Sequence, residues 1–347
     1  MRKKILLGLI TMTVIVFTVG CGKTNTQAKS DTIEGKMTIT KGGEYTLTGT
    51  SEDCQIVIDT DDDVTLILNG VDYTSTTGPV IYGAQVGHLY IELAEGTVNT
   101  LTDSDTYETD DQGNETAGDG VIACEDDITI TGGGTLNITA NYKHAIATDD
   151  SITVESGEVN VLSAVKDGIH ANDIVTINGG TLNITCDDEG IESKADMVIN
   201  GGTVTVNAKD DGLNAGSSIE INDGEITVTS TNGDAVDCNG GVDGCITING
   251  GTLVLTGADV PEGALDADTA SVIINGGKVT ATGGTNSPII ENGGENNITG
   301  STFMEGGQMG GQMGGQMGGP MGEKNGTRPE MPEGETPPEM PEKDLKN

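Results

Sequence analysis

The segments "VTINGGTLNIT" (residues 175–185) and "MVINGGTVTVN" (residues 197–207) repeat one phrase: a short strand pattern, a glycine turn and a second strand pattern. Apolar residues alternate with polar ones on both sides of the turn, which is typical of half-buried strands. Val175 and Ile177 are therefore predicted to point inward and Thr176 outward. Residues 31–300 show no helical periodicity, so the sequence predicts an all-β fold.

The phrase recurs along the chain at nearly constant spacing. The steps between the first residues after each turn are 23, 23, 22, 22, 27 and 26 residues, and these residues are Thr135, Glu158, Thr181, Thr203, Glu225, Thr252 and Lys278. A unit of about 22 residues with three short strands is one coil of a parallel β-helix, with the coils stacked about 4.8 Å apart. A β-sandwich of short strands is the alternative, and the regular spacing argues against it. One predicted inner column contains Val121, Ile146, Ile169, Ile191, Leu213, Val236 and Leu265.

The N-terminus has the features of a targeting segment. A basic "MRKK" precedes a short apolar run from Ile5 to Phe17, and "TVGC" (residues 18–21) resembles a lipobox. A signal anchor and simple secretion are the alternatives. We expect a lipoprotein signal peptide in residues 1–20, lipidation at Cys21, a linker in 21–32, the β-helix in 33–300 and a disordered tail rich in Gly, Met, Gln, Pro and Glu in 301–347.

The five cysteines after Cys21 form an odd, scattered set, which is not a disulfide framework. Cys186 and Cys238 stand where other repeats have Ala or Ser, so we interpret them as small core residues. Cys238 and Cys245 are close enough in sequence to pair, although nothing in the sequence requires it. Because no CxxC or HExxH motif is present, the sequence indicates no zinc site.

The segment "KDDGLNAG" (residues 209–216) places two acids before a glycine, and related patterns recur in successive coils. Aligning the repeats predicts that acids lie above acids through four coils. The position before the glycine is occupied by Asp167, Glu189, Asp211 and Asp234, and the position two residues after it by His170, Glu192, Asn214, Asp237 and Asp266. We interpret His144 and His170 as turn residues.

Stacked carboxylates oppose the fold unless something neutralises them. Two of them about 5 Å apart repel by roughly 1 kcal/mol in water and about 3 kcal/mol at an effective dielectric constant of 20. Ca²⁺ reverses the sign, because it binds about six to eight oxygen ligands. The sequence therefore predicts Ca²⁺ as a cofactor, with a solvated acidic edge as the alternative. The expected ligands are Asp167, Asp187, Asp188, Glu189, Glu192, Asp210, Asp211, Asp234 and Asp237.

The phrases "GEYTLTGT", "VTLILNGV", "GTVNTLTDSDTY" and "ITITGGGTLNIT", with the repeated "DGI" and "DGL" units, resemble the bacterial carbohydrate-binding β-helix family. The resemblance covers about residues 31–300. It implies a right-handed parallel β-helix with bound calcium on a surface protein. The founding member of that family binds cellulose and acidic sugars, and its fold is similar to calcium-dependent pectate lyases of polysaccharide lyase family 9. The resemblance does not decide between a binding module and an enzyme.

The favoured function is non-catalytic binding of a plant-type polysaccharide by a monomeric, extracellular protein with a lipid anchor in the cell membrane. Ca²⁺ would bridge the carboxylates of the protein to uronates. The net charge of −39 argues against nucleic acid as a partner, because the protein would repel phosphates. An acidic glycan such as polygalacturonate is favoured over cellulose, since the chain has no Trp and only six Tyr to stack on sugar rings.

Two other functions stay open. The first is a calcium-dependent pectate lyase, which needs a cation to acidify the α-proton and a base to remove it. Among Lys143, Lys166, Lys194 and Lys209, Lys166 is the best candidate for the base, because it adjoins Asp167 and shares a coil with His170. Against a lyase, the repeat region has no Arg to hold a uronate. The second is a purely structural or adhesive surface protein.

Overall fold

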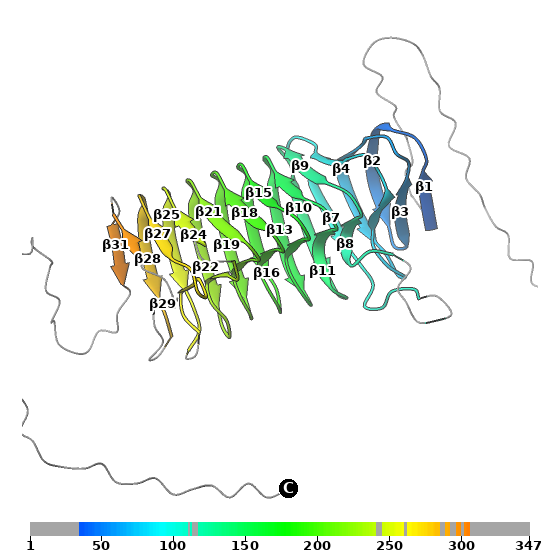
Figure 1. Cartoon of the computed structure of the whole chain (residues 1–347). Coiled ribbons are helices and arrows are strands. Elements are labelled where there is room, and N and C mark those ends of the chain that lie inside the picture. Colours follow the sequence, from blue (N-terminus) through cyan, green and yellow to red (C-terminus); the bar gives the residue numbers. More distant parts are fainter. Residues whose placement is uncertain are drawn as a thin grey trace, which may run out of the picture. The chain divides into compact units, whose positions relative to one another are not determined.

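The computed structural model describes residues 35–109, 112, 117–240, 245–259, 262–284, 289–291, 296–299 and 302–305. These residues form strands and turns and no helix, so nothing helical in the described part of the chain is long and apolar enough to cross a membrane. The strands run parallel and stack coil upon coil (Figure 1), which confirms the predicted parallel β-helix. The predicted signal peptide, Cys21 and the linker lie outside the described residues, as does nearly all of the predicted tail.

One stack of strands forms a separate sheet of eleven strands in the described part of the chain. In the regular coils its strands are only two to five residues long, and each pairs with its equivalent in the next coil. The strands are β1 (Gly35–Ile39), β3 (Cys54–Asp59), β5 (Ile81–Gln85), β8 (Gly120–Cys124), β11 (His144–Thr148), β14 (Ile169–Ala171), β17 (Ile191–Ser193), β20 (Leu213–Ala215), β23 (Val236–Cys238), β26 (Leu265–Asp266) and β29 (Ile290–Glu291).

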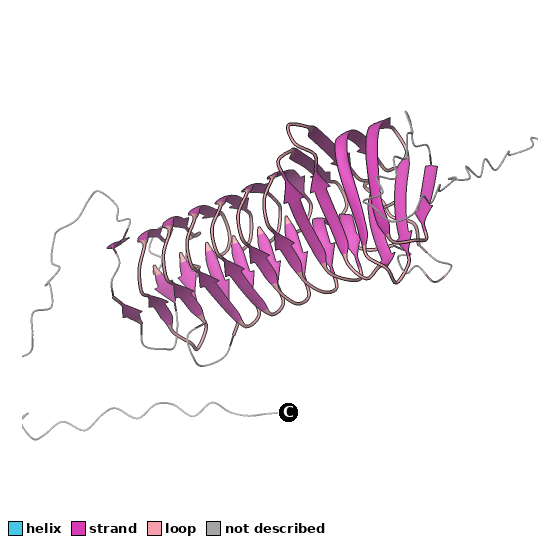
Figure 2. Cartoon of the chain, turned by 90° about the horizontal axis from the view of Figure 1, so that it is seen from above, coloured by secondary structure: helices cyan, strands magenta, loops and turns pink. Residues whose placement is uncertain are grey.

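The other two strands of each coil form the remaining stacks, seen side by side in Figure 2. The second stack contains β9 (Ile128–Gly132), β12 (Ile152–Val154), β15 (Val175–Ile177), β18 (Asp196–Ile199), β21 (Ser218–Ile221), β24 (Ile246–Ile248), β27 (Val272–Ile274) and β30 (Asn297–Ile298). The third stack contains β10 (Thr135–Ala140), β13 (Glu158–Ala164), β16 (Thr181–Thr185), β19 (Thr203–Ala208), β22 (Glu225–Ser230), β25 (Thr252–Thr256), β28 (Lys278–Thr282) and β31 (Thr302–Glu305). The last strand lies beyond residue 300, where the β-helix was expected to end.

Four strands begin the two joined stacks, and the first two are long. They are β2 (Gly43–Ser51), β4 (Val64–Thr74), β6 (Leu89–Leu93) and β7 (Val98–Thr102). Strand β4 pairs with β6 along its first half and with β7 along its second half, so hydrogen bonds join the second and third stacks into one sheet. This long strand makes the first coils less regular than those that follow.

The predicted register of the regular coils is confirmed residue by residue. The first residues after the turns pair in the expected order, from Thr135 with Glu158 through to Thr252 with Lys278. One position in the predicted inner column is wrong, because Ile146 pairs with Ile122 and not with Val121. The step between paired residues of β8 and β11 is therefore 24 residues. The sequence alignment, which placed Val121 in line with Ile146, implied a step one residue longer. From Ile146 to Leu265 the column is as predicted.

The core is a narrow aliphatic interior, built from stacked columns such as Ile169, Ile191 and Leu213, all fully buried. Burying each such side chain contributes roughly 1.5–3 kcal/mol. The glycine that follows the acids has a packing role. A Cβ built on Gly190 would lie 2.2 Å from Val206 Cγ1 and 2.4 Å from the Gly212 carbonyl oxygen. The backbone next to the acids therefore sits against the core with no space for a side chain.

A ladder of asparagine amides, which the sequence analysis did not predict, supports the turn between the second and third stacks. From Asn200 onward, each side-chain amide donates to the side-chain oxygen of the asparagine in the preceding coil, over 2.8–2.9 Å. Such a stack fixes each coil directly above its neighbour. The members are Asn178, Asn200, Asn222, Asn249 and Asn275.

Candidate functional site

Two files of polar side chains follow the eleven-stranded sheet. The strand file comprises the residues at the outward positions of β14, β17, β20, β23, β26 and β29, which pair in register: His170, Glu192, Asn214, Asp237, Asp266 and Glu291. The entry file comprises the residues just before these strands: Asp167, Glu189, Asp211 and Asp234. Backbone N–H groups of Gly168, Gly190 and Gly212 donate to the carbonyl oxygens of Glu189, Asp211 and Asp234 over 2.9–3.1 Å. The four acids of the entry file are thus stacked in register, as expected.

At the N-terminal end of the files, Asp167 lies between two histidines. Its Oδ2 atom is 3.0 Å from His144 Nδ1 and 2.8 Å from His170 Nδ1. The two imidazole rings lie 4.5 Å apart, centroid to centroid. Glu192 Oε2 lies 2.6 Å from His170 Nδ1, and its other oxygen contacts Lys194. Asp167 is only 1% exposed, so this charge depends on its neighbours rather than on water.

The pKa values in this group move in opposite directions for a common reason. Burial alone would raise the pKa of Asp167, but the hydrogen bonds to His144 and His170 outweigh it and hold the pKa well below its usual range. Burial alone would lower the pKa of His170, but hydrogen bonds to Asp167 and Glu192 raise it to about 9. The arrangement therefore demands positive charge at the point where the two carboxylates face the imidazoles.

Glu189 occupies the next coil, directly above Asp167. Oxygens of Asp167, Asp188 and Glu189 all lie within 4.8 Å of one another. Burial, followed by the hydrogen bond to Asp167 and its charge, raises the pKa of Glu189 to about 8. Burial and the neighbouring Asp167 thus both oppose a negative charge on Glu189, and a cation at this point would relieve that opposition.

Lysines occupy the outer edge of this region. Lys166 Nζ lies 3.0 Å from Asp188 Oδ2, and Lys209 Nζ lies 2.6 Å from Asp187 Oδ1. Asp187 and Asp210 are both exposed. These two predicted ligands therefore lie at the rim, away from the buried carboxylates of the files.

A group containing only carboxylates lies at the C-terminal end of the files. Oxygens of Asp234, Asp237 and Asp266 lie within 4.8 Å of one another. Burial raises the pKa of Asp234 to about 8, with the charge of Asp211 adding to the effect and the N–H of Gly263 opposing it. Burial, followed by the charges of Asp211 and Asp266, raises the pKa of Asp237 to about 7. These carboxylates come together at a cost that a cation would remove.

Amides link the acids of this C-terminal group. Asn214 Nδ2 donates to Asp211 Oδ2 over 3.0 Å and to Asp237 Oδ2 over 3.1 Å. Asn239 also donates to Asp237 Oδ2, over 2.7 Å. Glu291, next to Asp266 in the strand file, has a buried Oε1 with no hydrogen-bond partner. Neutral donors hold the carboxylates in place but do not balance their charge.

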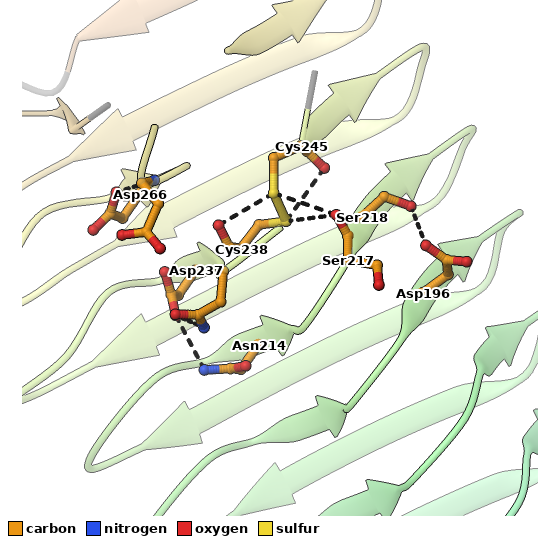
Figure 3. Close-up of a disulfide and its surroundings, with 10 residues drawn as sticks. Asp196, Asn214, Ser217, Ser218, Asp237, Cys238, Cys245 and Asp266 are labelled. Carbon is orange, nitrogen blue, oxygen red and sulfur yellow. Dashed lines mark hydrogen bonds between the residues drawn. A yellow bond between two sulfur atoms is a disulfide. The ribbon is translucent and has the colours of Figure 1, made fainter. Parts of the chain in front are cut away.

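A disulfide joins Cys238 to Cys245 beside this group (Figure 3). Cys238 directly follows Asp237, so the bond ties the end of β23 to the chain just before β24. The sequence left this pairing open, and the interpretation of Cys238 as a core residue is only half of its role. Cys54, Cys124 and Cys186 are free and buried, and Cys186 is the small core residue expected.

Each lysine considered as a catalytic base is paired with a carboxylate: Lys143 with Asp119, Lys166 with Asp188, Lys194 with Glu192 and Lys209 with Asp187. The hydrogen bond to Asp188 raises the pKa of Lys166 and outweighs its partial burial. A base that removes a carbon-bound proton needs the neutral amine, so this shift is in the wrong direction for catalysis.

The tyrosines in the described part of the chain contact other protein groups. Tyr73 and Tyr107 are buried, and Tyr142 stacks on Tyr107 with ring centroids 4.3 Å apart. Tyr90 stacks on His88, and the Tyr82 hydroxyl donates to Glu125 over 2.7 Å. The polar files are therefore the more distinctive surface of this β-helix.

The sequence analysis missed the participation of His144, His170, Asp266 and Glu291. The interpretation of His144 and His170 as turn residues is wrong, because they lie in strands β11 and β14. No local motif signals a pair that comes from two different coils. The aligned column already placed Asp266 after Asp237, and the strand pairing across the 29-residue step agrees with it, but Asp266 was not named as a ligand. For Glu291 the available signal was the same column, read beyond Asp266.

Comparison with known proteins places these features in context. Residues 33–196 and 181–313 match a family model described as carbohydrate-binding domain-containing protein. A protein of that description from Acetivibrio thermocellus is 35% identical over 136 residues, which span 37% of this chain and about half (47%) of that relative. A solved structure, described as the polysaccharide lyase-like protein from C. thermocellum, gadolinium derivative, is 35% identical with a TM-score of 0.57, covering 61% of this chain and 89% of the other.

Proposed function

Because the chain belongs to the family of carbohydrate-binding domain-containing proteins, we propose that it binds acidic polysaccharide without cleaving it, with Ca²⁺ held by its stacked carboxylates. The observation that carries this proposal is the carboxylate group of Asp234, Asp237 and Asp266. Its carboxylates come from successive coils, with Asp234 and Asp237 buried and Asp266 half-buried. Bound Ca²⁺ would supply positive charge that uronate carboxylates can share.

The donor set of this group fits Ca²⁺. Calcium–oxygen distances of about 2.3–2.6 Å place ligand oxygens on opposite sides of the ion up to about 5 Å apart. The oxygens of Asp234, Asp237 and Asp266 lie within 4.8 Å of one another, and Glu291 adds an unpartnered oxygen beside Asp266. The similar solved structure is described as a gadolinium derivative, and gadolinium ions also prefer hard oxygen ligands. Asp211 completes the set of acids that we assign to this site.

The charge of the protein explains why an acidic glycan would need the ion. With a net charge of −39, the chain repels polyuronates unless a cation lies between the two sets of carboxylates. Neutral glycans such as cellulose would instead need exposed aromatic rings, and the tyrosines of the described coils are largely engaged with protein groups. Both considerations favour an acidic glycan as the ligand.

The lysines support binding over catalysis. A lyase needs an amine that loses its proton readily, whereas every lysine near the files is paired with a carboxylate. Lys166 is the residue that a lyase would use, and its pKa is raised rather than lowered. We therefore assign Lys166 to charge balance with Asp188.

We also propose that the protein acts outside the cytoplasm, anchored through Cys21. The basic and apolar N-terminal sequence supports this, as does the Cys238–Cys245 disulfide, since such bonds persist in oxidising compartments. Metabolic labelling with a radioactive fatty acid tests the anchor. We expect label in the wild type and none in a Cys21→Ala variant. Label that persists without Cys21 would contradict lipidation there.

Affinity electrophoresis through gels containing polygalacturonate tests the proposed ligand. We expect retardation in Ca²⁺, normal mobility in EDTA, and loss of retardation in an Asp234→Asn/Asp237→Asn variant. Asp72→Asn is the matched control, because Asp72 is exposed on β4, a strand outside the eleven-stranded sheet. Equal retardation in EDTA would contradict calcium bridging, and no retardation on any polyuronate would contradict the ligand class.

The same polysaccharide separates binding from cleavage. We expect no gain in the ultraviolet absorbance of unsaturated uronates after prolonged incubation with Ca²⁺. A gain that is lost in Lys166→Ala would replace the binding proposal with the lyase alternative.

A further inference from the structure

The histidine–carboxylate group at the N-terminal end of the files differs chemically from the all-carboxylate group. It contains two imidazoles, His144 and His170, and the nearly fully buried carboxylate of Asp167. The ligand-capable atoms of these three residues lie within 4.8 Å of one another, and the two Nδ1 atoms lie 3.0 and 2.8 Å from Asp167 Oδ2. Imidazole is a ligand for Zn²⁺, Cu²⁺ and Ni²⁺, whereas Ca²⁺ takes oxygen.

The neighbours of His170 orient its Nδ1 lone pair toward this group. Asn172 Nδ2 donates to Asp149 Oδ1 over 3.0 Å, which turns Asn172 Oδ1 toward His170 Nε2, 3.3 Å away. A carbonyl oxygen only accepts, so His170 Nε2 carries a hydrogen and donates to it. In the neutral ring, Nδ1 is then unprotonated and faces two carboxylate oxygens, at 2.8 Å on Asp167 and 2.6 Å on Glu192. Metal-binding histidines are commonly held by such a second hydrogen bond.

The atoms around Asp167 also leave bonding capacity unused. His144 Nδ1 accepts a hydrogen bond from the Asp167 N–H over 3.3 Å while lying 3.0 Å from Asp167 Oδ2. The His144 Nδ1 atom cannot accept a hydrogen bond from the Asp167 N–H and donate one to Asp167 Oδ2 at the same time. Asp167 Oδ1 is buried and accepts no hydrogen bond at all, which is costly for a carboxylate. A cation at this point would use the lone pairs of both rings and both oxygens of Asp167.

We propose that His144, Asp167 and His170 form a binding site for a divalent transition metal of the Zn²⁺ class. Zinc binds imidazole nitrogen and carboxylate oxygen at about 2.0–2.2 Å, which places neighbouring ligand atoms of a tetrahedral site about 3.3–3.6 Å apart. The Nδ1–Oδ2 separations of 3.0 and 2.8 Å are a few tenths of an ångström shorter, so small movements of these side chains would admit the ion. Glu192 borders the same point and supplies a fourth ligand, with Lys194 balancing its other oxygen. The site is separate from the proposed Ca²⁺ site, so Asp167 is reassigned to this metal.

Calorimetric titration of the full chain with ZnCl₂ in excess Ca²⁺ tests the site. The protein for this titration is produced without a polyhistidine tag, which would itself bind Zn²⁺. The excess Ca²⁺ occupies the sites whose ligands are all oxygen, so that Zn²⁺ does not bind there. We expect one Zn²⁺ per chain in the wild type and in His88→Gln. This variant is the matched control, because His88 is the remaining histidine of the chain. His144→Gln and His170→Gln should abolish the binding. Asn172→Ala, which removes only the outer hydrogen bond, should weaken it about 10- to 100-fold.

Cobalt substitution gives an independent readout of the ligand types. We expect Co²⁺ bound at this site to show the visible bands of nitrogen and oxygen coordination and no thiolate charge-transfer band, since the group of ligand atoms contains no cysteine sulfur and the thiol of Cys186 donates to the carbonyl oxygens of Asp188 and Glu189. Melting curves of each variant check that it is folded. Absence of stoichiometric Zn²⁺ binding to the wild type overturns the proposal. Unchanged binding in folded His144→Gln and His170→Gln variants overturns it equally, and neither result depends on glycan binding.

Discussion

At the scale of single residues, the partners of a buried carboxylate decide its charge. Asp167 meets two imidazoles and its pKa falls, whereas Asp234 meets other acids and its pKa rises to about 8. Asp103, far from both groups in sequence, shows the effect of burial in simpler surroundings. Its carboxylate accepts from the Asn141 N–H over 2.6 Å and from the Tyr107 hydroxyl over 2.8 Å. Burial nevertheless raises its pKa to about 6.

Asp103→Asn should flatten one part of the pH dependence of stability. The pKa of Asp103 is higher in the folded state than the ordinary value of about 4, so its stabilisation is complete below pH 4 and is lost as the pH rises through about 6. Between pH 4 and pH 8 the free energy of unfolding of the variant should therefore rise by about 2–3 kcal/mol relative to that of the wild type. Urea unfolding of both proteins at several pH values measures this difference in the free energy of unfolding. The contributions of the other acids are the same in both proteins and cancel. Parallel pH profiles would contradict the prediction, and Asp72→Asn serves as the exposed control.

At the scale of the elements, close backbone packing keeps the acids in register. In three successive coils the residue between the acid and the strand is a glycine whose added Cβ would clash with a core side chain. Gly168, Gly190 and Gly212 face Ile184, Val206 and Val228 in this way, at 2.0–2.3 Å. The asparagine ladder at the turn between the second and third stacks aligns the turns in the same manner. Both features specify a coil spacing that repeats.

Gly190→Ala should destabilise the β-helix by about 1–3 kcal/mol, the usual cost of overpacking a core. Its Cβ would lie 2.2 Å from Val206 Cγ1, and backbone on the other side prevents easy relaxation. Gly201→Ala is the matched control, since its Cβ would meet only Asn178 O at 3.5 Å, an ordinary contact. We expect the control to change stability by less than about 0.5 kcal/mol. Equal chemical denaturation curves for the two variants would contradict the prediction, because they would show that the contact with Val206 does not reduce stability.

At the scale of the whole molecule, acidity and stacking together make the fold sensitive to cations. Each regular coil adds acids to the same edge, so like charges accumulate along the files. An ion that binds only the folded chain stabilises it, by about 2.7 kcal/mol when its concentration is a hundred times the dissociation constant. The β-helix should therefore respond to calcium as one unit.

Calcium should raise the melting temperature of the full chain, and EDTA should reverse the rise. Asp234→Asn/Asp237→Asn should melt higher than the wild type in EDTA, because the amides remove buried repulsion, but should gain little from Ca²⁺. Mg²⁺ should have less effect, since it gives up its water reluctantly. Calorimetric melting with each ion measures these shifts. Identical melting temperatures with Ca²⁺ and EDTA would leave the C-terminal carboxylates without an ion-binding role.

The sequence alone predicted the parallel β-helix, its coil length and the pairing of nearly every regular coil. This was possible because a coil pairs mainly with equivalent positions of its neighbours, so a linear repeat translates directly into lateral contacts. The stacking of Asp167, Glu189, Asp211 and Asp234 followed from the same rule. Only the join at β8 was misplaced by one residue, where the irregular coils begin.

The tertiary structure decided which of these side chains converge and which stay apart. His144 reaches Asp167 from the preceding coil, Glu291 follows Asp266 in the strand file, and Cys238 pairs with Cys245. Asp187 and Asp210, although acidic and adjacent in sequence to the files, lie at the exposed rim. Repeats determine the height of each residue along the β-helix, but the direction of its side chain depends on the turn geometry and on what packs around it. The chemistry of the site depends on that direction, which no linear pattern encodes.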